Sequence, residues 1–266
     1  MQADLHLHST ASDGLIAPAA LADAVAAAGL GAAALTDHDT CAGFPAFAAH
    51  AAEAGVVPIC GAEIAAEEGG QEVHLLSYFR EMPGGAYGDL VSRLGAARQD
   101  RAREMLRRLA ALGIRLDEKE VLRHERPGRP HIARALVKAG VVRDVSEAFT
   151  RLLSRGGPGY VSRYRPEARD VIAFAHHQGG LTTLAHPRRY SRLPLLELRS
   201  ADLDALEAIH PSADGPQTAE LRATAARLGL LVTGGSDFHG RPDDPPLGTY
   251  AVSGEEIHSL LRRLGA

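Results

Sequence analysis

Near the start of this 266-residue chain stands the segment Asp4-Leu5-His6-Leu7-His8-Ser9-Thr10-Ala11-Ser12-Asp13-Gly14. Apolar and polar side chains alternate through its first half, which predicts a β-strand with His6 and His8 on one face. Two neutral imidazoles on one face can bind a divalent metal ion, and Asp13, just beyond the strand, can add a carboxylate oxygen. Histidines spaced in this way also occur in proteins that bind no metal, so the interpretation needs support from the rest of the chain.

Histidines and carboxylates occur in the same setting at several other places, at or near the ends of apolar runs. They lie in the segments Thr36-Asp37-His38-Asp39-Thr40, Gly61-Ala62-Glu63, Val73-His74-Leu75-Leu76, Ala185-His186-Pro187 and Gly235-Ser236-Asp237-Phe238-His239. Helical patterns separate most of these runs, and barrel enzymes built from alternating strands and helices carry their chemistry at the C-terminal ends of the strands. One shared metal site explains all the segments more simply than a separate cause for each.

Five of the motifs resemble those of a known family, the PHP (polymerase and histidinol phosphatase) family of metal-dependent phosphoesterases. They are DLHLHSTASDG, ALTDHDT, GAE, AHP and GSDFH, in this order between residue 3 and about residue 250. Their layout is most similar to that of stand-alone members that act as nucleoside 3′,5′-bisphosphate phosphatases or as phosphoesterases of 5′-nucleotides and oligoribonucleotides. The resemblance implies an α/β fold, namely a distorted (β/α)7 barrel with an inserted helical subdomain, and a hydrolase of phosphoric ester bonds.

The composition is that of a globular protein. Apolar residues make up 45% of the chain and charged residues 23%, and no apolar run is long enough to span a bilayer. No basic and apolar leader follows Met1, and the two cysteines, Cys41 and Cys60, are too few for a disulfide framework. We therefore expect a cytoplasmic protein without membrane association or an obligate protein partner, acting on a small phosphorylated substrate such as a nucleotide or short oligoribonucleotide.

The net charge of −4 hides an asymmetry between two parts of the chain. Residues 85–166 contain 18 Lys and Arg against 9 Asp and Glu, whereas the remainder contains 11 against 24. Sixteen of those 18 basic residues are arginines, whose guanidinium group binds phosphate through two parallel hydrogen bonds. An acidic part that collects metal ions and an arginine-rich part together suit an anionic substrate, although most of the arginines individually are expected on a solvated surface.

Periodicity and turn residues predict the elements of the barrel. Besides the strand of the first motif, strands are expected at residues 31–36, 56–60, 71–79, 181–185, 205–209, 230–233 and 248–252. Helices are expected at residues 18–29, 44–54, 166–177, 194–201, 217–228 and 255–264.

The alternation of strands and helices stops between the fourth and fifth strands. A long amphipathic helix at residues 89–112 is followed by shorter helical segments at 117–124, 130–139 and 145–153. We therefore expect a metal-binding barrel of residues 1–84 and 167–266, and an inserted substrate-binding subdomain of residues 85–166. Within this subdomain Arg129, His131 and Arg134 surround a helix start at Pro130, where free backbone N–H groups and basic side chains can bind phosphate.

By the resemblance, nine side chains hold three divalent metal ions. His6, His8 and Asp237 hold the first ion, and Glu63 bridges it to the second. His74 and His186 complete the second site. Asp13, His38 and His239 hold the third ion. Composition and spacing alone do not divide the ligands in this way. Imidazole and carboxylate ligands together suit Mn²⁺, the ion we expect, or Fe²⁺ or Zn²⁺, better than Ca²⁺.

Such a cluster of ions makes the hydrolysis of phosphate esters possible near neutral pH. It lowers the pKa of a bound water, which supplies a metal-bound hydroxide for in-line attack, and it stabilises the charge on the leaving oxygen. We expect Asp237 to accept the proton of the attacking water while it ligates metal. His210 ends the strand at 205–209 and is either a substrate contact or leaving-group acid, or a structural residue. Asp37 and Asp39 are expected to support the site.

Two other functions are compatible with the same motifs. One is histidinol-phosphate phosphatase, which the arginine-rich subdomain disfavours because a small monophosphate needs fewer phosphate donors. The other is a non-catalytic metal-binding PHP module that stabilises a polymerase, which the complete ligand set and the lack of an attached polymerase disfavour. The leading hypothesis is a phosphoesterase acting on a nucleoside 3′,5′-bisphosphate, a nucleoside 5′-monophosphate or the 5′ end of a short RNA.

Overall fold

A computed structural model describes residues 1–190 and 193–265, and the contacts among them divide the chain into two compact units. The first unit, the barrel, consists of Met1–Leu90 and Arg165–Ala266, and the second, the insert, of Val91–Tyr164. The boundary lies inside a helix, because α3 (Gly85–Ala111) begins in the barrel and continues into the insert.

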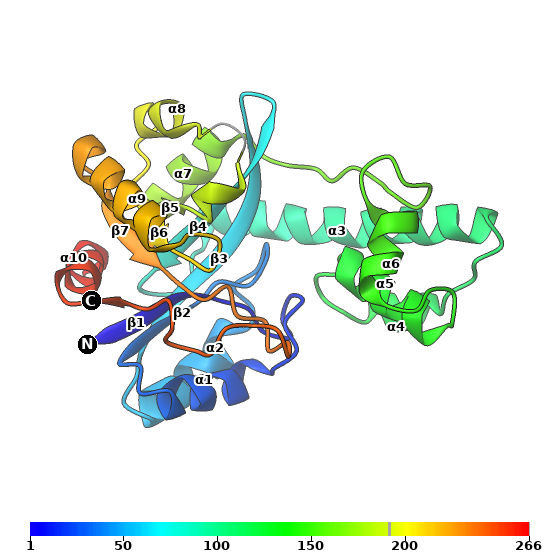
Figure 1. Ribbon diagram of the computed structural model, residues 1–266, viewed down its shortest axis with the longest axis horizontal. Coiled ribbons are helices and arrows are strands. Elements are labelled where there is room, and N and C mark those ends of the chain that lie inside the picture. The colour runs from blue at the N-terminus through cyan, green and yellow to red at the C-terminus, as the bar shows by residue number, and fades with distance from the viewer. Residues whose placement is uncertain (191–192, 266) are drawn as a thin grey trace. The chain divides into compact units, whose positions relative to one another are not determined.

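The barrel consists of one sheet of eight strands in the order β7-β6-β5-β4-β3-β2-β1-β8 (Figure 1). The strands are β1 Gln2–Leu7, β2 Ala32–Leu35, β3 Val57–Glu68, β4 Gln71–Phe79, β5 Leu181–Leu184, β6 Ala205–Ile209, β7 Leu231–Gly234 and β8 Val252–Ser253. Beyond β7, Phe238 pairs with Leu7 at the end of β1, and its carbonyl oxygen accepts the His8 N–H at 2.9 Å. This link nearly closes the sheet, and the expected α/β barrel is confirmed.

Strand β4 runs against both of its neighbours, whereas β1, β2 and β3 are parallel to one another, as are β5, β6 and β7. Side chains alternate in the same way in either direction, so the sequence pattern did not predict the reversal. It corrects the position expected for His74, which lies near the N-terminal end of β4 and pairs with Ala65 of β3. Because Glu63 pairs with Leu76, His74 becomes its diagonal neighbour on the same face.

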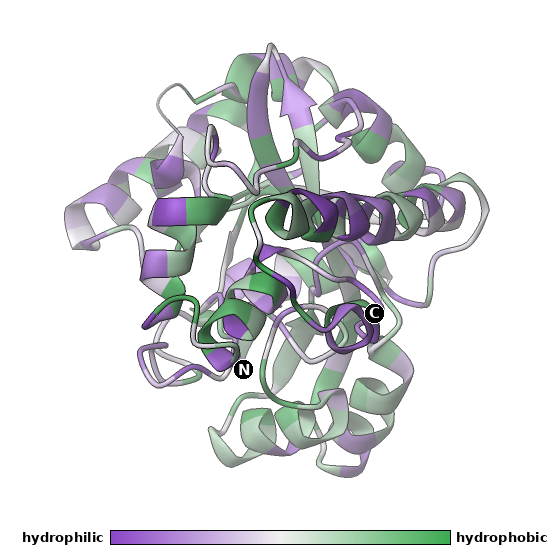
Figure 2. Ribbon diagram, turned by 90° about the vertical axis from the view of Figure 1, so that its right-hand side faces the viewer, coloured by the Kyte–Doolittle hydropathy of each residue, from purple (hydrophilic) through white to green (hydrophobic). Residues whose placement is uncertain are grey.

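Helices cover the barrel strands, and most lie within two residues of the expected bounds. They are α1 Pro18–Ala27, α2 Phe44–Glu53, α7 Ala168–His176, α8 Leu195–Ser200, α9 Gly215–Leu228 and α10 Glu255–Leu264. Figure 2 shows hydrophobic and hydrophilic bands along the helical ribbons, as expected where one side of a helix covers a core. Leu5 of β1, for example, shares a buried cluster with Ile257 and Leu260 of α10. Among the described residues, no helix is long and apolar enough to cross a bilayer.

Two strands differ in length from the sequence prediction by more than two residues. Strand β3 continues past the expected end at Cys60 because Gly61 lets two backbones approach: a Cβ atom there would lie 2.9 Å from the Ser77 carbonyl oxygen. Strand β8 is limited to Val252–Ser253, since Gly248 has a φ of +84° and turns the chain just before it. Glu63 therefore lies within a strand, not beyond its end.

The insert has a hydrophobic core of its own. It contains the later part of α3 with α4 Glu118–Leu122, α5 Arg129–Lys138 and α6 Val145–Ala148 (Figure 1). The expected helix at 145–153 is divided, because its second half forms a π-helical turn at Phe149–Leu153. Leu109, Ile132 and Leu136 are fully buried in one cluster. These contacts stabilise the insert and involve none of the nine candidate metal ligands.

Candidate metal centre

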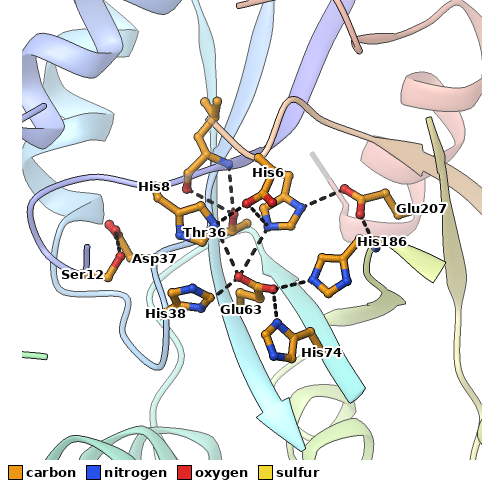
Figure 3. A network of polar contacts seen from close by, with 12 residues as sticks. His6, His8, Ser12, Thr36, Asp37, His38, Glu63, His74, His186 and Glu207 are labelled. Carbon is orange, nitrogen blue, oxygen red and sulfur yellow. Dashed lines mark hydrogen bonds and ion pairs between the residues drawn. The ribbon is translucent and has the colours of Figure 1, made fainter. Parts of the chain in front are cut away.

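The nine side chains selected by the sequence motifs lie in one cluster, on the barrel strands or in the segments that directly follow them. Their ligand atoms form three groups, each within 4.8 Å: His6, His8 and Asp237; Glu63, His74 and His186; and His8, Asp13, His38 and His239. Figure 3 shows the Glu63 carboxylate among the surrounding imidazoles. Segments from β1, β2, β3, β4, β5 and β7 contribute, so residues up to 233 positions apart meet in a single place.

Glu63 lies between two of these groups and directs one oxygen toward each. Its Oε1 is 2.5 Å from Nδ1 of His74 and 3.0 Å from Nε2 of His186. Its Oε2 is 2.9 Å from Nδ1 of His38 and 3.3 Å from Nε2 of His8. A carboxylate with different imidazoles at its two oxygens has the geometry of a bridge between two cations.

Aspartates connect the remaining imidazoles to the same cluster. Asp237 Oδ1 lies 3.3 Å from Nε2 of His8 and 3.5 Å from Nε2 of His6. Asp13 Oδ1 lies 3.4 Å from Nε2 of His239, whose ring stacks on that of His8 with centroids 4.2 Å apart. Because His8 belongs to two of the groups, the ligand atoms form one continuous centre.

Strained backbone turns two of the ligands into the site. His186 and Asp237, at the ends of β5 and β7, have φ values of +32° and +52°. Only a few per cent of residues other than glycine adopt this left-handed region, and they concentrate at functional sites. Gly235 is required at the same strand end, since a Cβ atom there would lie 2.4 Å from the Cβ of His6. The Gly-Ser-Asp motif therefore lets β7 approach β1 closely.

Glu207 is part of the site, and the sequence analysis missed it. This fully buried carboxylate contacts Nδ1 of His6 at 2.9 Å and accepts the backbone N–H of His186. A carboxylate at Nδ1 fixes the orientation of the ring and leaves Nε2 directed at the site. The signal was present, because Glu207 is the one charged residue in the otherwise apolar strand Ala205–Ile209.

Two further buried aspartates hold the loops that carry ligands. Asp37 accepts hydrogen bonds from the backbone N–H and hydroxyl of Ser9, at 2.7 and 2.6 Å, and from the hydroxyl of Ser12 at 2.5 Å. Asp4 accepts the backbone N–H of Ser236 at 3.0 Å. Asp37 therefore has the supporting role expected for it and fixes the loop that leads to Asp13.

Burial and mutual charges set the protonation of the ligands. Burial, reinforced by the charge of His239, lowers the pKa of His8 to about 3, and burial lowers the pKa of His186 to about 4. Burial alone would raise the pKa of Glu63, but His38 and other nearby histidines outweigh it and hold that pKa well below its ordinary value. His8 and His186 are therefore neutral and Glu63 is ionised, which are the forms that bind metal ions. At His6 burial alone would lower the pKa, but the charges of Glu207 and Asp237 outweigh it and raise that pKa well above its ordinary value.

The donor set fits divalent cations. Within the described part of the chain, Glu63 Oε2, Asp13 Oδ1 and the Nε2 atoms of His6 and His8 are buried without a hydrogen-bond partner. Leaving a buried polar atom unpaired is costly, so a cluster of such atoms is explained by a cation that they share. Mixed nitrogen and oxygen ligands are typical of first-row transition metals.

His210 lies in the same site, where its Nε2 is buried without a hydrogen-bond partner among the described residues. It is 1% exposed, and its Nδ1 accepts the backbone N–H of Ser212 at 2.9 Å. In the neutral ring the proton therefore resides on Nε2, which lies 3.5 Å from Oδ2 of Asp237. The ring centroid is 5.6 Å from that of His186. His210 therefore lies next to the candidate ligands and directs its Nε2–H toward Asp237.

The three residues proposed from the sequence as substrate ligands lie in the insert, on α5. The Arg129 guanidinium lies over Phe149, 5.4 Å from the ring centroid. His131 is buried, and its Nδ1 accepts the backbone N–H of Gly128 at 3.0 Å, which gives it a structural role at the helix start. Arg134 is partly buried on the same helix.

Arg129 belongs to a group of like charges within the insert. Arg101 and Arg129 each place the guanidinium carbon 5.9 Å from the centroid of the Tyr160 ring. Burial, followed by the charges of Arg129, Arg163 and Arg98, lowers the pKa of Arg101 to about 10. We call Arg98, Arg101, Arg129 and Arg163 the arginine cluster. Positive charges held together in this way favour the binding of an anion.

Several known proteins are similar to this chain over most of its length. The 3′,5′-nucleoside bisphosphate phosphatase of Chromobacterium violaceum is 33% identical over 252 residues, covering 89% of this chain and 86% of that protein. The 5′-3′ exoribonuclease Rnm of Salmonella typhimurium is also 33% identical, covering 89% of this chain and 84% of its own.

Solved structures agree with these sequences. A protein of Bifidobacterium adolescentis described as a metal-dependent phosphoesterase superposes with a TM-score of 0.89 at 32% identity, covering 98% of this chain and 96% of that one. A Chromobacterium violaceum structure described as an amidohydrolase with bound sulfate has a TM-score of 0.87 at 30% identity, with 99% and 97% covered. The family model of the PHP domain matches residues 4–210. With its ligand motifs gathered in one metal-binding cluster, the chain belongs to the PHP domain family.

Proposed function

We propose that this protein hydrolyses phosphate monoesters of nucleotides, with divalent metal ions held by the barrel cluster. The observation that carries the proposal is the position of Glu63, whose two oxygens face two separate sets of imidazoles. Ions held at its two oxygens would lie close enough to act on a single phosphoryl group. The names of the relatives support nucleotides, since one acts on nucleoside bisphosphates and another on RNA.

The proposal includes three ions, with Mn²⁺ first and Fe²⁺ or Zn²⁺ as alternatives. Their ligands are His6, His8 and Asp237 for one, His74 and His186 for the second, Asp13, His38 and His239 for the third, and Glu63 as the bridge. When bound, such ions supply a water of lowered pKa and neutralise charge on the phosphate. Glu207 keeps the His6 ring oriented for this purpose through its Nδ1.

Asp237 and His210 move the protons in this proposal. Burial disfavours the charge of Asp237, but the charge of His6 and further histidine contacts hold its pKa well below the ordinary value, so the carboxylate stays ionised. It can therefore accept a proton from the attacking water. His210 presents Nε2–H near the Oδ2 of Asp237 and donates a hydrogen bond to the leaving oxygen, which receives the proton that Asp237 has taken from the water.

The insert contributes to substrate binding through its basic side chains. Arg129 and Arg134 are the proposed phosphate contacts, and Arg129 is supported by its place in the arginine cluster. His131 can contribute through Nε2 only, because Nδ1 accepts the Gly128 N–H. A substrate that carries a second phosphate, such as a nucleoside 3′,5′-bisphosphate, has a use for such cations. Histidinol phosphate, the alternative substrate, has no second phosphate for these cations to bind.

Cytoplasmic location is also part of the proposal. Its support is that Cys41 and Cys60 are both buried free thiols, as is usual for proteins of a reducing compartment.

A panel assay of the metal-loaded protein tests the function. The substrates are a nucleoside 3′,5′-bisphosphate, a nucleoside 5′-monophosphate, a 5′-phosphorylated short RNA, a cyclic phosphodiester and histidinol phosphate. We expect the highest kcat/KM for one of the first three, and loss of activity after chelation that returns with Mn²⁺. A preference for histidinol phosphate would replace the proposed substrate class, and inactivity toward all of them would favour the non-catalytic module.

A further inference from the structure

Asp237 uses its two carboxylate oxygens for different partners. Oδ1 faces the Nε2 atoms of His6 and His8, at 3.5 and 3.3 Å. Oδ2 lies 3.5 Å from Nε2 of His210 and accepts a hydrogen bond from Nη2 of Arg189 at 3.0 Å. Arg189 ends the short 3-10 turn Pro187–Arg189 that follows β5, and half of its side chain is exposed (52%).

The two carboxylate oxygens of Asp13 also face different partners, one a histidine and the other an arginine. Oδ1 lies 3.4 Å from Nε2 of His239, and Oδ2 lies 3.4 Å from Nη2 of Arg241. Arg241 is 36% exposed, and its backbone is held in place because Asp244 accepts the N–H groups of both Arg241 and His239, at 2.8 and 2.6 Å. The loop after β7 therefore delivers a ligand histidine and an arginine together, as the loop after β5 does.

These contacts are not explained as ordinary surface ion pairs. Both aspartates are among the candidate metal ligands, and a guanidinium beside a metal ligand repels the cation that the ligand binds. Two loops nevertheless place an arginine in this position. The arrangement becomes favourable when an anion joins the site, because the anion attracts the arginines and the metal ions together.

We propose that Arg189 and Arg241, here called the rim arginines, bind the phosphoryl group of the substrate above the metal ligands. Each guanidinium contacts its aspartate through Nη2, and its other N–H groups extend from a side chain that is at least one-third exposed. Planar guanidinium groups match the oxygens of a phosphoryl group, and two of them from different loops define its orientation. This inference rests on the proposed phosphoester substrate.

The test measures binding of inorganic phosphate to the metal-loaded protein by isothermal titration calorimetry, together with metal content. The variants are Arg189→Gln and Arg241→Gln. The matched control is Arg188→Gln, since Arg188 precedes Arg189 in the same turn, is 41% exposed and contacts Glu220 instead of the metal centre. We expect each rim variant to weaken phosphate binding about tenfold, as for the loss of one charged hydrogen bond, and to retain the wild-type metal content. The control should bind phosphate like the wild type.

Two results would overturn the inference. If both variants bind phosphate as the wild type does, the rim arginines do not contact the phosphoryl group. If they lose metal in parallel with phosphate, their role is to orient the aspartates. Failure of the proposed function looks different, because the unchanged protein would then hydrolyse none of the phosphate esters in the panel. If the wild type is active and the rim variants bind phosphate with unchanged affinity, only the proposed role of the rim arginines is excluded, and the proposed function stands.

Discussion

The barrel and the insert use charged side chains in opposite ways. In the barrel, His6 and Glu207 are fully buried and contact each other at 2.9 Å. In the insert, Glu147 of α6 pairs with Arg143, just before this helix, and with Arg151, one turn after it, and both arginines are exposed. A buried ion loses the hydration free energy that a surface ion retains. A buried charge is therefore stable only where opposite charges or hydrogen bonds compensate for this loss. Burial, more than the number of charges, therefore distinguishes functional charges in this chain.

The arginine cluster differs from the other charged residues of the insert, because it includes a charge that is partly buried. Burial lowers the pKa of Arg101, which lies against Tyr160, and the charges of three other arginines lower it further. Like charges held together repel one another, as the carboxylates of the barrel would without cations between them. The comparison thus predicts that cations complete the barrel site and that an anion completes the arginine cluster. Each of the following experiments tests one side of it.

The largest effect is expected for Glu63→Gln, which keeps the size of the side chain and removes its charge. Since Glu63 faces two sets of imidazoles, we expect fewer metal ions per chain and a fall in kcat/KM of about 10³- to 10⁴-fold, equivalent to about 4–5.5 kcal/mol. Elemental analysis and steady-state kinetics measure the two effects. Glu53→Gln, at an exposed helix end, is the control, and circular dichroism checks the fold. A full metal complement in Glu63→Gln would exclude the bridging role.

Much of the fold was predictable, because the periodicity of apolar residues indicates helices and strands, and glycine and proline mark their ends. Glycines at helix ends, such as Gly29 and Gly55, marked the ends of α1 and α2. The reversed direction of β4 was not predictable, since an alternating strand has the same pattern either way. The length of β3 was missed because Gly61 resembled the end of a strand, whereas the structure uses it for close approach of Ser77. Glycine in a sequence does not reveal which of the two roles it plays.

The site was predictable where its residues stand in motifs. Histidines and acids concentrated in short segments such as Asp37-His38-Asp39 identified the strand ends that meet. Glu207 lacked such neighbours and was lost in an apolar strand, although a lone acid there signals a buried partner. Arg189 and Arg241 could not be distinguished from the other arginines, because only the fold reveals which carboxylates they contact.

Leu136→Ala is expected to have the next largest effect, on stability alone. Leu136 is fully buried in the core of the insert. Its truncation should lower the free energy of unfolding by about 2–5 kcal/mol, through lost burial and the cavity that remains. Chemical denaturation measures this change, and elemental analysis should find the metal content unaltered. Loss of metal at low denaturant would show instead that the barrel site depends on the packing of the insert.

A smaller effect is expected for Glu207→Gln. The amide can still accept the His186 N–H, but it loses the charge that orients His6. Removing such a partner of a metal-binding histidine costs about 10- to 100-fold in metal affinity. Competition with a chromogenic chelator measures the affinity. Glu220→Gln, at an exposed position on α9, should change nothing. Equal affinity in both variants would mean that strand packing alone orients His6.

The smallest and most selective effect is expected for Arg129→Gln in the arginine cluster. If the cluster binds a second phosphate, the loss of one charged contact should lower kcat/KM for a nucleoside 3′,5′-bisphosphate about tenfold, or about 1.4 kcal/mol. Hydrolysis of p-nitrophenyl phosphate, which has a single phosphate, should stay the same. Metal content should also stay the same, because arginine is not a ligand.

The like charges around Arg129 provide a second readout that separates binding from folding. Removing one cation relieves repulsion on Arg101 and gives up the contacts of the guanidinium with Phe149 and Tyr160, each worth about 1 kcal/mol or less, so the free energy of unfolding should fall by about 2 kcal/mol or less. The control is Arg143→Gln, since Arg143 pairs with Glu147 on the surface of the same insert. Equal losses on both substrates would indicate a general defect of the site. No loss on either would return Arg129 to the solvated arginines, and the barrel alone would then carry the recognition of phosphate.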